Sequence, residues 1–408
     1  MKCRFCSETL NSCFVDLGSS PPSNAYLDRF SIMAPEKWFP LKILVCESCW
    51  LVQTEDFADR SELFNHDYAY FSSFSETWLQ HSLKFKQNIC ERLNLNQKSF
   101  VVEVAANDGY LLQFFSSDGI PCVGIEPTLS TAQAAREKGI RVIQEFFGED
   151  LGRKICSDYG QADLIIANNV LAHVPDINDF LKGFVELLKP NGVATFEFPS
   201  FLNLVQGKQF DTIYHEHFSY LSVTTAVKIF SGNGLNIFDV EELPTHGGSV
   251  RIHAQSSKYS HYPKSKRLND MLSLEINAGI KNPIFYQGFS NVATKIKNDL
   301  VSFLIDAKTN GKIVCGYGAA AKGNTLLNYS GIRPDLLPFV ADKNPAKQNK
   351  FLPGSRIPVF SEEELYNRKP DYVLILPWNI KVEIKKQLAK IRNWNGKFVT
   401  AVPSLEVF

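Results

Sequence analysis

Residues 101–109 read Val-Val-Glu-Val-Ala-Ala-Asn-Asp-Gly, a short apolar run that passes directly into a turn sequence. An apolar run that ends in Asn, Asp and Gly predicts a buried strand followed by a tight turn. Gly109 lets the backbone of that turn approach a ligand closely, because glycine has no side chain. The stretch therefore predicts a cofactor-binding turn, with Glu103, Asn107, Asp108 and Gly109 as candidate contacts.

Strand and helix patterns alternate around this stretch, over residues 65–255. Apolar runs predict strands at 100–104, 121–125, 162–167 and 192–198, and amphipathic runs predict helices at 129–138 and 180–188. This alternation is typical of a doubly wound α/β domain with a parallel sheet. Because ligands of such sheets bind beyond the carboxyl ends of the strands, we expect the loops there to form the site.

Three further loops of this domain carry candidate cofactor contacts. Glu126 and Pro127 follow the second predicted strand, where an acid suits the two hydroxyls of a ribose. A solvated acid before a helix-starting proline is an equal alternative. Phe146 could flank an adenine ring or belong to the core with its neighbour. Asn168 and Asn169 interrupt the apolar run after the third long strand and complete the predicted cofactor site.

A second strand–helix alternation occupies residues 256–408. Strands are predicted at 312–315, 337–340, 372–376 and 397–402. The motif Gly316-x-Gly318-x-x-Ala321 follows the first of them, with Lys322 beside it and Asp342 further on, as in a dinucleotide-binding fingerprint. Taken alone, this motif predicts an NAD(P)-dependent oxidoreductase.

Two Cys-x-x-Cys pairs lie within residues 1–64. Cys3, Cys6, Cys46 and Cys49 have the spacing of a tetrahedral thiolate site for Zn²⁺. Four thiolates leave no coordination position for water or substrate, so we expect the zinc to be structural. The alternatives are a chance spacing, or a zinc-binding adaptor attached to a non-catalytic scaffold.

The composition favours a small-molecule enzyme. The chain has 408 residues, enough for two or three domains, with 43 Lys and Arg against 43 Asp and Glu. This balance does not point to nucleic acid or to an anionic membrane as the main partner. With no signal-like beginning and no run of about 18 apolar residues, we expect a cytoplasmic protein, and we expect a monomer.

Taken together, these motifs resemble the class I S-adenosylmethionine-dependent methyltransferases, and in particular the sugar C-methyltransferases. The resemblance is carried by five segments along nearly the whole chain: the cysteine pairs, the Glu103 to Gly109 segment, Glu126, the segment 168–174 that reads Asn-Asn-Val-Leu-Ala-His-Val, and the segment 214–220 that reads Tyr-His-Glu-His-Phe-Ser-Tyr. A Gly-Tyr-Gly-Ala-Ala-Ala-Lys-Gly segment at 316–323 completes it. The resemblance implies a zinc-binding N-terminal module, a methyltransferase-like doubly wound sheet and a Rossmann-like C-terminal domain that contributes to nucleotide-sugar binding.

The same resemblance implies an activity and roles for individual residues. It implies transfer of a methyl group from S-adenosylmethionine to a nucleoside-diphosphate 4-keto-6-deoxysugar, at C-3. Methylation at carbon needs a base that removes the proton next to the ketone and groups that stabilise the enolate. His217 is implied as this base, with Glu216 and Tyr214 orienting the sugar or its oxyanion. His173 is the candidate contact to the substrate oxygen, and Tyr68 is implied to close over the donor and the sugar.

The remaining candidates are substrate contacts. Tyr70 belongs to the same segment as Tyr68, and His246 and Arg251 flank a glycine turn that could meet the substrate or its phosphates. Gly318, Ala319 and Lys322 are assigned to the diphosphate. Three alternatives stay open: His215 and His217 as two metal ligands, His173 as a structural histidine, and the turn at 245–251 as a structural hairpin.

Overall fold

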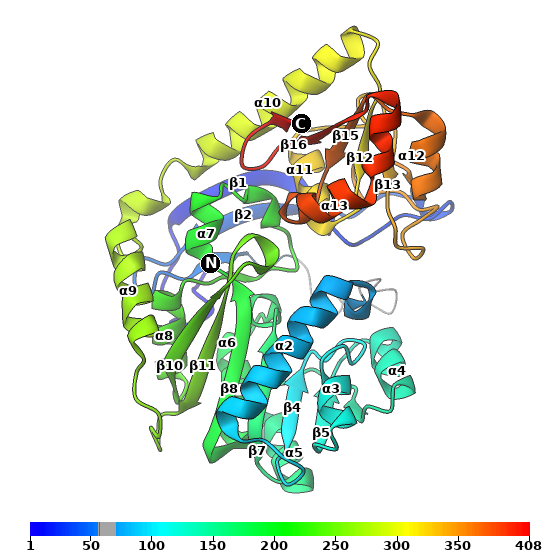
Figure 1. Cartoon of the computed structure of the whole chain (residues 1–408). Helices are drawn as coiled ribbons and strands as arrows, with labels where there is room; N and C mark the ends of the chain where they lie inside the picture. The colour runs from blue at the N-terminus through cyan, green and yellow to red at the C-terminus, as the bar shows by residue number, and fades with distance from the viewer. Residues whose placement is uncertain (56, 58–70) are drawn as a thin grey trace.

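The computed structural model describes residues 1–55, 57 and 71–408, so Tyr68 and Tyr70 lie outside the described residues. The described chain forms three sheets with helices packed around them (Figure 1). The architecture confirms the predicted α/β fold class, because two of the sheets are largely parallel and alternate with helices along the chain.

The middle sheet has seven strands in the order β10-β11-β8-β7-β4-β5-β6. Five of them run parallel, and β10 and β11 are antiparallel to their neighbours. Strand β4 is buried along its whole length, which explains its continuous apolar sequence. The bounds are β4 Val101–Val104, β5 Cys122–Ile125, β6 Val142–Ile143, β7 Ala162–Asn168, β8 Leu188–Pro199, β10 Leu235–Leu243 and β11 Ser249–Ser256.

Helices cover both faces of this sheet, and α2 crosses in front of it in Figure 1. A Cβ atom added to Gly152 of α5 would lie 2.5 Å from the Gly183 carbonyl oxygen of α6, so the glycines allow these helices to touch. The bounds are α2 Glu76–Leu93, α3 Leu112–Ser117, α4 Leu129–Glu137, α5 Glu149–Tyr159, α6 Ile177–Leu187, α7 Phe201–Gln206 and α8 Val223–Gly232.

The C-terminal sheet has six strands in the order β14-β13-β12-β15-β16-β17. All pairs are parallel except β16 with β17, and the strand order reverses between β12 and β15, where doubly wound sheets open a crevice. The bounds are β12 Val314–Tyr317, β13 Val340–Ala341, β14 Val359–Phe360, β15 Tyr372–Ile375, β16 Lys397–Thr400 and β17 Glu406–Val407, with α11 Ala321–Tyr329, α12 Glu362–Arg368 and α13 Lys381–Gln387.

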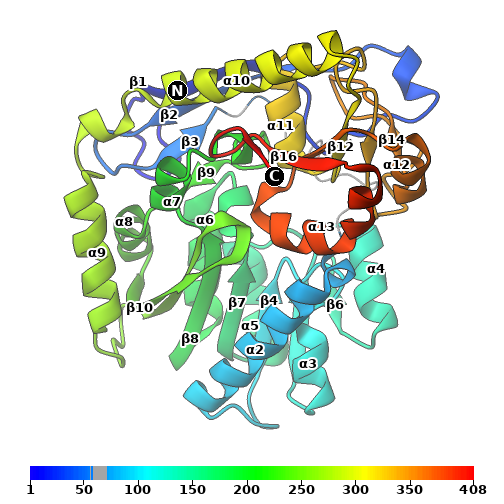
Figure 2. The ribbon, with the colours of Figure 1, turned by 45° about the horizontal axis from the view of Figure 1, so that its top comes forward.

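Two long helices, α9 (Lys266–Ala278) and α10 (Phe289–Thr309), lead from the middle sheet to the C-terminal one. Figure 2 shows α10 lying along β1 and the C-terminal sheet. Short 3-10 turns connect many elements: η1 Ser31–Met33, η2 Ser72–Phe74, η3 Leu171–His173, η4 Phe210–Thr212, η5 Thr245–Gly247, η6 Pro283–Tyr286, η7 Trp378–Ile380 and η8 Ala389–Trp394. Four of them, η3, η4, η5 and η7, carry residues of the site described below.

The N-terminal sheet joins distant parts of the chain. Its order is β1-β2-β3-β9, with β1 at Ser12–Ser20, β2 at Phe39–Val45, β3 at Val52–Thr54 and β9 at Ser219–Tyr220. Strand β9 directly follows His217 and Phe218, and Val52 pairs with Tyr220. The cysteine-rich segment is therefore attached to the segment that carries the candidate base.

None of the helices in the described part of the chain is both long and apolar enough to cross a membrane.

Candidate active site

The imidazole of His217 has one defined hydrogen bond that sets its tautomer. Its Nδ1 lies 2.8 Å from the carbonyl oxygen of Thr212 in η4. A carbonyl oxygen can only accept, so Nδ1 carries the hydrogen and Nε2 keeps a lone pair when the ring is neutral. A neutral imidazole in this tautomer is a base at Nε2.

His173 and Tyr214 surround His217. The His173 Nδ1 donates to the Glu216 carbonyl oxygen at 2.7 Å, and the His173 and His217 ring centroids are 4.7 Å apart. The Tyr214 ring lies 4.0 Å from the His217 ring, centroid to centroid. The Phe218 amide donates to the Ala172 carbonyl at 2.8 Å and so ties this segment to η3. The structure thus brings together three of the side chains that the sequence assigned to catalysis.

Burial keeps these imidazoles neutral. It lowers the pKa of His217 well below its usual range, and the charge that His173 would carry lowers it further. Burial likewise lowers the pKa of His173 to about 4. His246 of η5, whose φ is +54°, has its pKa lowered to about 4 by burial and by the charge of Lys322. At neutral pH the cluster therefore offers neutral nitrogen bases.

One buried carboxyl group, that of Glu216, belongs to the same segment. The Asn24 side-chain amide donates to its Oε1 at 3.1 Å. Burial raises the pKa of Glu216, and its Oε2 has no hydrogen-bond partner among the described residues. A buried oxygen without a partner is costly, which suits a group that meets a substrate hydroxyl.

The candidate cofactor contacts lie on the loops after β4, β5 and β7. Asn107 has a φ of +49°, and its amide donates to Glu126 Oε2 at 2.9 Å, while the Thr128 amide donates to Oε1 at 2.9 Å. Asp108 Oδ2 accepts from the Ser73 amide at 3.2 Å, and Gly109 has a φ of +74°. The acid after β5 thus holds the turn after β4 in place.

The other residues of this group differ in exposure. Glu103 is fully buried, and burial raises its pKa well above the usual range. Asn168 is buried at the end of β7, and Asn169 follows with a φ of +55°. Pro127 is half-buried after Glu126. Phe146 is exposed, whereas its neighbour Phe147 packs on two phenylalanines of α6. Only Phe146 of this aromatic pair is open to a ligand.

Arg251, a candidate contact to the substrate or its phosphates, has an internal partner. Its Nη2 lies 2.6 Å from Glu197 Oε2 on the neighbouring strand β8, and both side chains are almost fully buried. His81 of α2 meets the same carboxylate oxygen at 2.9 Å, and Thr245 donates to Oε1 at 3.0 Å. Although burial opposes it, hydrogen bonding from His81 and the charge of Arg251 lower the pKa of Glu197 to about 2. Arg251 therefore joins β11, β8 and α2.

Replacing Arg251 with Met should destabilise the protein strongly. The change leaves the Glu197 carboxylate buried without its cation, and breaking a buried pair in this way costs about 3–5 kcal/mol. Denaturant unfolding measures the loss. Arg153→Met is the matched control, because its pair with Glu149 is exposed and spaced i,i+4, worth about 0.3–0.5 kcal/mol. Equal stabilities for the two variants would contradict this account of Glu197.

Three candidate residues lie at the start of α11, near the middle sheet. Lys322 Nζ donates to Asn379 Oδ1 at 2.8 Å and lies 4.7 Å from the centroid of the Trp378 ring. Gly318 has a φ of +84° and packs against the residue before Trp378. The Ala319 amide, which the sequence assigned to a diphosphate, donates to Asp342 Oδ2 at 2.6 Å. Lys322 is therefore the group of this loop best suited to an anionic ligand.

The four paired cysteines come together as a metal site requires. Sγ of Cys3 lies 3.6 Å from Sγ of Cys49, and Sγ of Cys6 lies 3.5 Å from Sγ of Cys46. A zinc tetrahedron with Zn–S bonds of about 2.3 Å has sulfurs about 3.8 Å apart, so the residues fit Zn²⁺. Gln53 Nε2 donates to Cys3 Sγ at 3.3 Å, a typical outer-shell contact.

The two cysteine pairs also share a backbone geometry. The residue after each pair, Ser7 or Trp50, has a positive φ of 62° or 67°. Its amide donates to the carbonyl of the first cysteine, at 2.9 Å for Ser7 and 2.8 Å for Trp50. Each turn presents both of its sulfurs on one side. This repeated turn is why the Cys-x-x-Cys spacing predicted the cluster correctly.

His215 and His217 do not converge on a common metal position. His215 Nε2 lies 3.3 Å from the carbonyl oxygens of Phe39 and Pro40 in β2, whereas His217 turns towards η4. Among the described residues, the groups that could hold a metal are the four cysteines and the set Asp239, Glu241 and His253. The second set already has arginine partners for both of its acids.

Several polar residues of this region were missed by sequence reasoning. They form two hydrogen-bonded pairs, Asp211 with Trp378 and Glu197 with His81. The two members of each pair lie far apart in sequence and make contact only in the folded chain. Asp211 and Trp378 follow no motif. Glu197 had a weak signal, as a single acid within an apolar strand sequence.

Comparisons with known proteins support a three-part chain. Family models match residues 3–64, described as "Putative zinc binding domain", residues 78–240, described as "Methyltransferase domain", and residues 244–403, described as "C-methyltransferase C-terminal domain". The C-methyltransferase NovU of Streptomyces niveus is 33% identical over 406 residues, which span 100% of this chain and 96% of that protein.

More distant similarities cover the middle of the chain. A ubiquinone biosynthesis O-methyltransferase of Escherichia coli O7:K1 is 23% identical over 159 residues, 36% of this chain and 65% of that protein. A crystal structure of magnesium protoporphyrin IX methyltransferase from Synechocystis PCC 6803 with bound SAM is 14% identical, with a TM-score of 0.36, and covers 50% of this chain and 100% of that one.

Proposed function

The chain belongs to the C-methyltransferase family, and from this we propose that it methylates a nucleoside-diphosphate 4-keto-6-deoxysugar at C-3, with S-adenosylmethionine as the donor. Similarity to a C-methyltransferase over the full chain supports the class of reaction. The keto sugar is supported by chemistry, because a sugar carbon becomes nucleophilic only next to a carbonyl group.

The observation that carries the proposal is the hydrogen bond between His217 Nδ1 and the Thr212 carbonyl at 2.8 Å. It leaves Nε2 of a neutral imidazole as the base that takes the proton from C-3. The electron pair of the broken C–H bond forms the enolate, whose carbon then attacks the methyl group. S-adenosylmethionine, when bound, would supply that methyl group as an electrophile, and S-adenosylhomocysteine would leave with the electron pair of the broken sulfur–methyl bond.

The groups around His217 have complementary roles in the proposal. Tyr214, whose ring packs against the base, is assigned to the sugar oxygen on which enolate charge develops. His173 keeps its predicted contact to the substrate; because its Nδ1 donates to the Glu216 carbonyl, its Nε2 can accept a hydrogen bond from a substrate hydroxyl. Glu216, whose Oε2 has no partner among the described residues, is assigned to a sugar hydroxyl. Tyr68 and Tyr70 keep their predicted roles in closing over donor and sugar, and both lie outside the described residues.

The donor is assigned to the loops after β4, β5 and β7. Glu126 is buried at the end of β5, with each carboxylate oxygen held by one backbone amide. The side chains of Thr128 and Thr131 also hydrogen-bond to this carboxylate. A carboxylate has about four acceptor sites, so bonding to a ribose hydroxyl would use or replace one of these contacts. The other assigned contacts are Glu103, Asn107, Asp108, Gly109, Pro127, Phe146, Asn168 and Asn169.

Replacing Glu126 with Gln should weaken donor binding about tenfold or more, because a hydrogen bond to a charged acceptor is worth about 1.5–3 kcal/mol. Calorimetric titration with S-adenosylhomocysteine measures the change. Glu145→Gln is the control, because Glu145 has an exposed surface pair with Lys154. Unchanged affinity in a folded Glu126 variant would remove the ribose role.

The nucleotide end of the substrate is assigned to Lys322, with Gly318 and Ala319 shaping the loop and His246 nearby. Lys322 is half-buried at the start of α11, so its ammonium can meet a diphosphate with reduced competition from water. The cysteine cluster is assigned a structural Zn²⁺, because four thiolates fill its coordination sphere.

Mass spectrometry of reaction products tests the proposal. The protein is incubated with S-adenosylmethionine and a panel of nucleoside-diphosphate 4-keto-6-deoxysugars, with parallel reactions that contain NADH or NADPH. A sugar nucleotide that gains one methyl group, together with S-adenosylhomocysteine, is the expected result. Reduction of the sugar without methylation would favour the NAD(P)-dependent oxidoreductase, and binding without turnover would favour the adaptor.

A further inference from the structure

The short turn η4 lies between the candidate base and the C-terminal sheet. Its Thr212 carbonyl holds His217 Nδ1, as described above. The preceding residue, Asp211, is completely buried, and its Oδ2 accepts a hydrogen bond from Trp378 Nε1 at 2.7 Å. Directly after the turn, the Ile213 carbonyl accepts from Thr325 Oγ1 of α11 at 2.8 Å. Hydrogen bonds from Trp378 and from Thr325 of α11 thus fix η4, and η4 in turn fixes the imidazole of His217.

Trp378 is the centre of this contact. Its ring lies against Lys322, and a Cβ atom added to Gly247 of η5 would be 2.7 Å from Trp378 Cη2. Gln209, next to η4, donates from Nε2 to the Gly247 carbonyl at 2.8 Å. The indole therefore packs between η5 and α11, and its N–H group is directed at Asp211. The residue is half-buried, and the Nε1 hydrogen bond and these two packing contacts fix the orientation of the ring.

We propose that Asp211 and Trp378 are positioning residues for His217, a role that rests on the proposed function of His217 as base. Through the hydrogen bond from Trp378, Asp211 fixes η4, so that the Thr212 carbonyl keeps the hydrogen of His217 on Nδ1. The base is therefore aligned only when the C-terminal sheet is seated against the methyltransferase sheet.

The charge of Asp211 gives a second reason for its presence. Its Oδ1 has no hydrogen-bond partner among the described residues, and a buried carboxylate oxygen without a partner is costly. The groups that face His217 include Lys322, whose charge disfavours an imidazolium, and His173 and His246, which would do so only if they were protonated. Burial raises the pKa of Asp211 to about 6, and the charge of the nearby Lys322 opposes this rise. The ionised form of Asp211 partly offsets the charge of Lys322 when His217 takes a proton.

Trp378→Phe is the principal test, because it keeps an aromatic ring beside Lys322 and removes the N–H group together with part of the indole, a loss of ring atoms that the Trp394→Phe control shares. We expect kcat to fall about tenfold, the loss of one hydrogen bond to a charged acceptor, with KM for S-adenosylmethionine unchanged. ¹⁵N NMR of the histidine rings, which needs no sugar, should show His217 as the Nδ1–H tautomer in the wild type and as a tautomer mixture in the variant. Asp211→Asn should give the same two changes.

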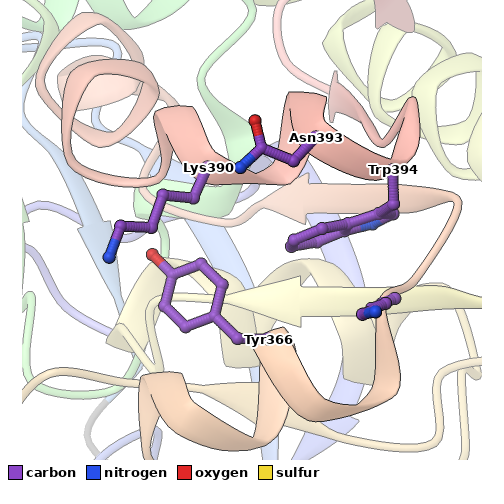
Figure 3. Close-up of a pocket in the computed structure, with 5 residues that line it drawn as sticks. Tyr366, Lys390, Asn393 and Trp394 are labelled. Carbon is purple, nitrogen blue, oxygen red and sulfur yellow. The ribbon is translucent and has the colours of Figure 1, made fainter.

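The chain offers a matched control in Trp394. This second tryptophan of the C-terminal sheet donates from Nε1 to the Pro370 carbonyl at 2.9 Å, just before β15 begins, whereas Trp378 follows the end of β15. It lines a separate surface cavity of about 420 Å³ with Tyr366, Lys369, Lys390 and Asn393 (Figure 3). Trp394→Phe loses an equivalent hydrogen bond, and both kcat and the His217 tautomer should stay as in the wild type.

Two results would overturn the inference. One is an unchanged His217 tautomer and unchanged kcat in folded Trp378→Phe and Asp211→Asn proteins. The other is an equal loss in Trp394→Phe, which would indicate general destabilisation. The proposed function has a separate test. If His217→Asn retains turnover, His217 is not the base, whatever the result for the Trp378 variant.

Discussion

Replacing His217 with Asn should reduce methyl transfer about 10²- to 10⁴-fold, the usual contribution of a positioned general base. Asn has no nitrogen lone pair that can accept the proton from a carbon atom, although its side chain fills part of the same space. Turnover is measured as S-adenosylhomocysteine release under saturating donor and sugar nucleotide. Donor affinity should stay unchanged, because His217 contacts η4 and the rings of His173 and Tyr214 rather than the β4 and β5 loops.

His215→Asn is the matched control for this substitution. His215 lies two residues earlier on the same segment and is also buried, but its Nε2 faces the β2 carbonyls of Phe39 and Pro40. We expect at most a few-fold loss of turnover in this variant. An equal loss in both variants would contradict a specific role as base and would reopen the interpretation of the pair as metal ligands.

Replacing Cys49 with Ser should abolish metal binding and unfold the N-terminal module. Three thiolates and a hydroxyl bind Zn²⁺ far more weakly, and metal binding in small sites of this kind contributes about 10 kcal/mol to folding. Elemental analysis should find one zinc per wild-type chain and less than that in the variant. Limited proteolysis should then cleave first within residues 1–55.

Cys13→Ser controls for loss of a thiol alone, because Cys13 is exposed on β1 and lies outside the cluster. Its zinc content and stability should match the wild type. The N-terminal sheet also reaches the candidate base, since Thr54 Oγ1 donates to the His217 carbonyl at 3.2 Å. Slow loss of activity should therefore follow unfolding of the module. A metal-free protein that stays folded yet loses turnover at once would contradict a structural role for zinc.

The parts of the fold that local sequence determines were predicted well. The strand at 101–104 and its turn follow from an apolar run and from residues that tolerate positive φ, such as Asn107 and Gly109. The cysteine cluster follows from two identical turns that each orient a pair of sulfurs. In each of these cases the decisive interactions lie within a few residues along the chain.

The predictions failed where distant segments meet. Nothing in the sequence around Ser219 and Tyr220 indicates that they add a strand to the N-terminal sheet, because that pairing depends on β3. The pairing of Arg251 with Glu197 could not be predicted, because the two residues lie on different strands. The contact between Asp211 and Trp378 joins residues that are 167 positions apart. Such pairs are fixed by packing of whole sheets, which local patterns do not encode.

The central claim is that His217 removes the proton next to the sugar ketone, and deuterium incorporation tests it most directly. The sugar nucleotide is incubated in deuterated water with the protein and S-adenosylhomocysteine, so that no methyl group is available, and proton loss at C-3 is followed by NMR. The account predicts exchange at C-3 with the wild type and none above background with His217→Asn. Exchange at the wild-type rate in the His217 variant would contradict it.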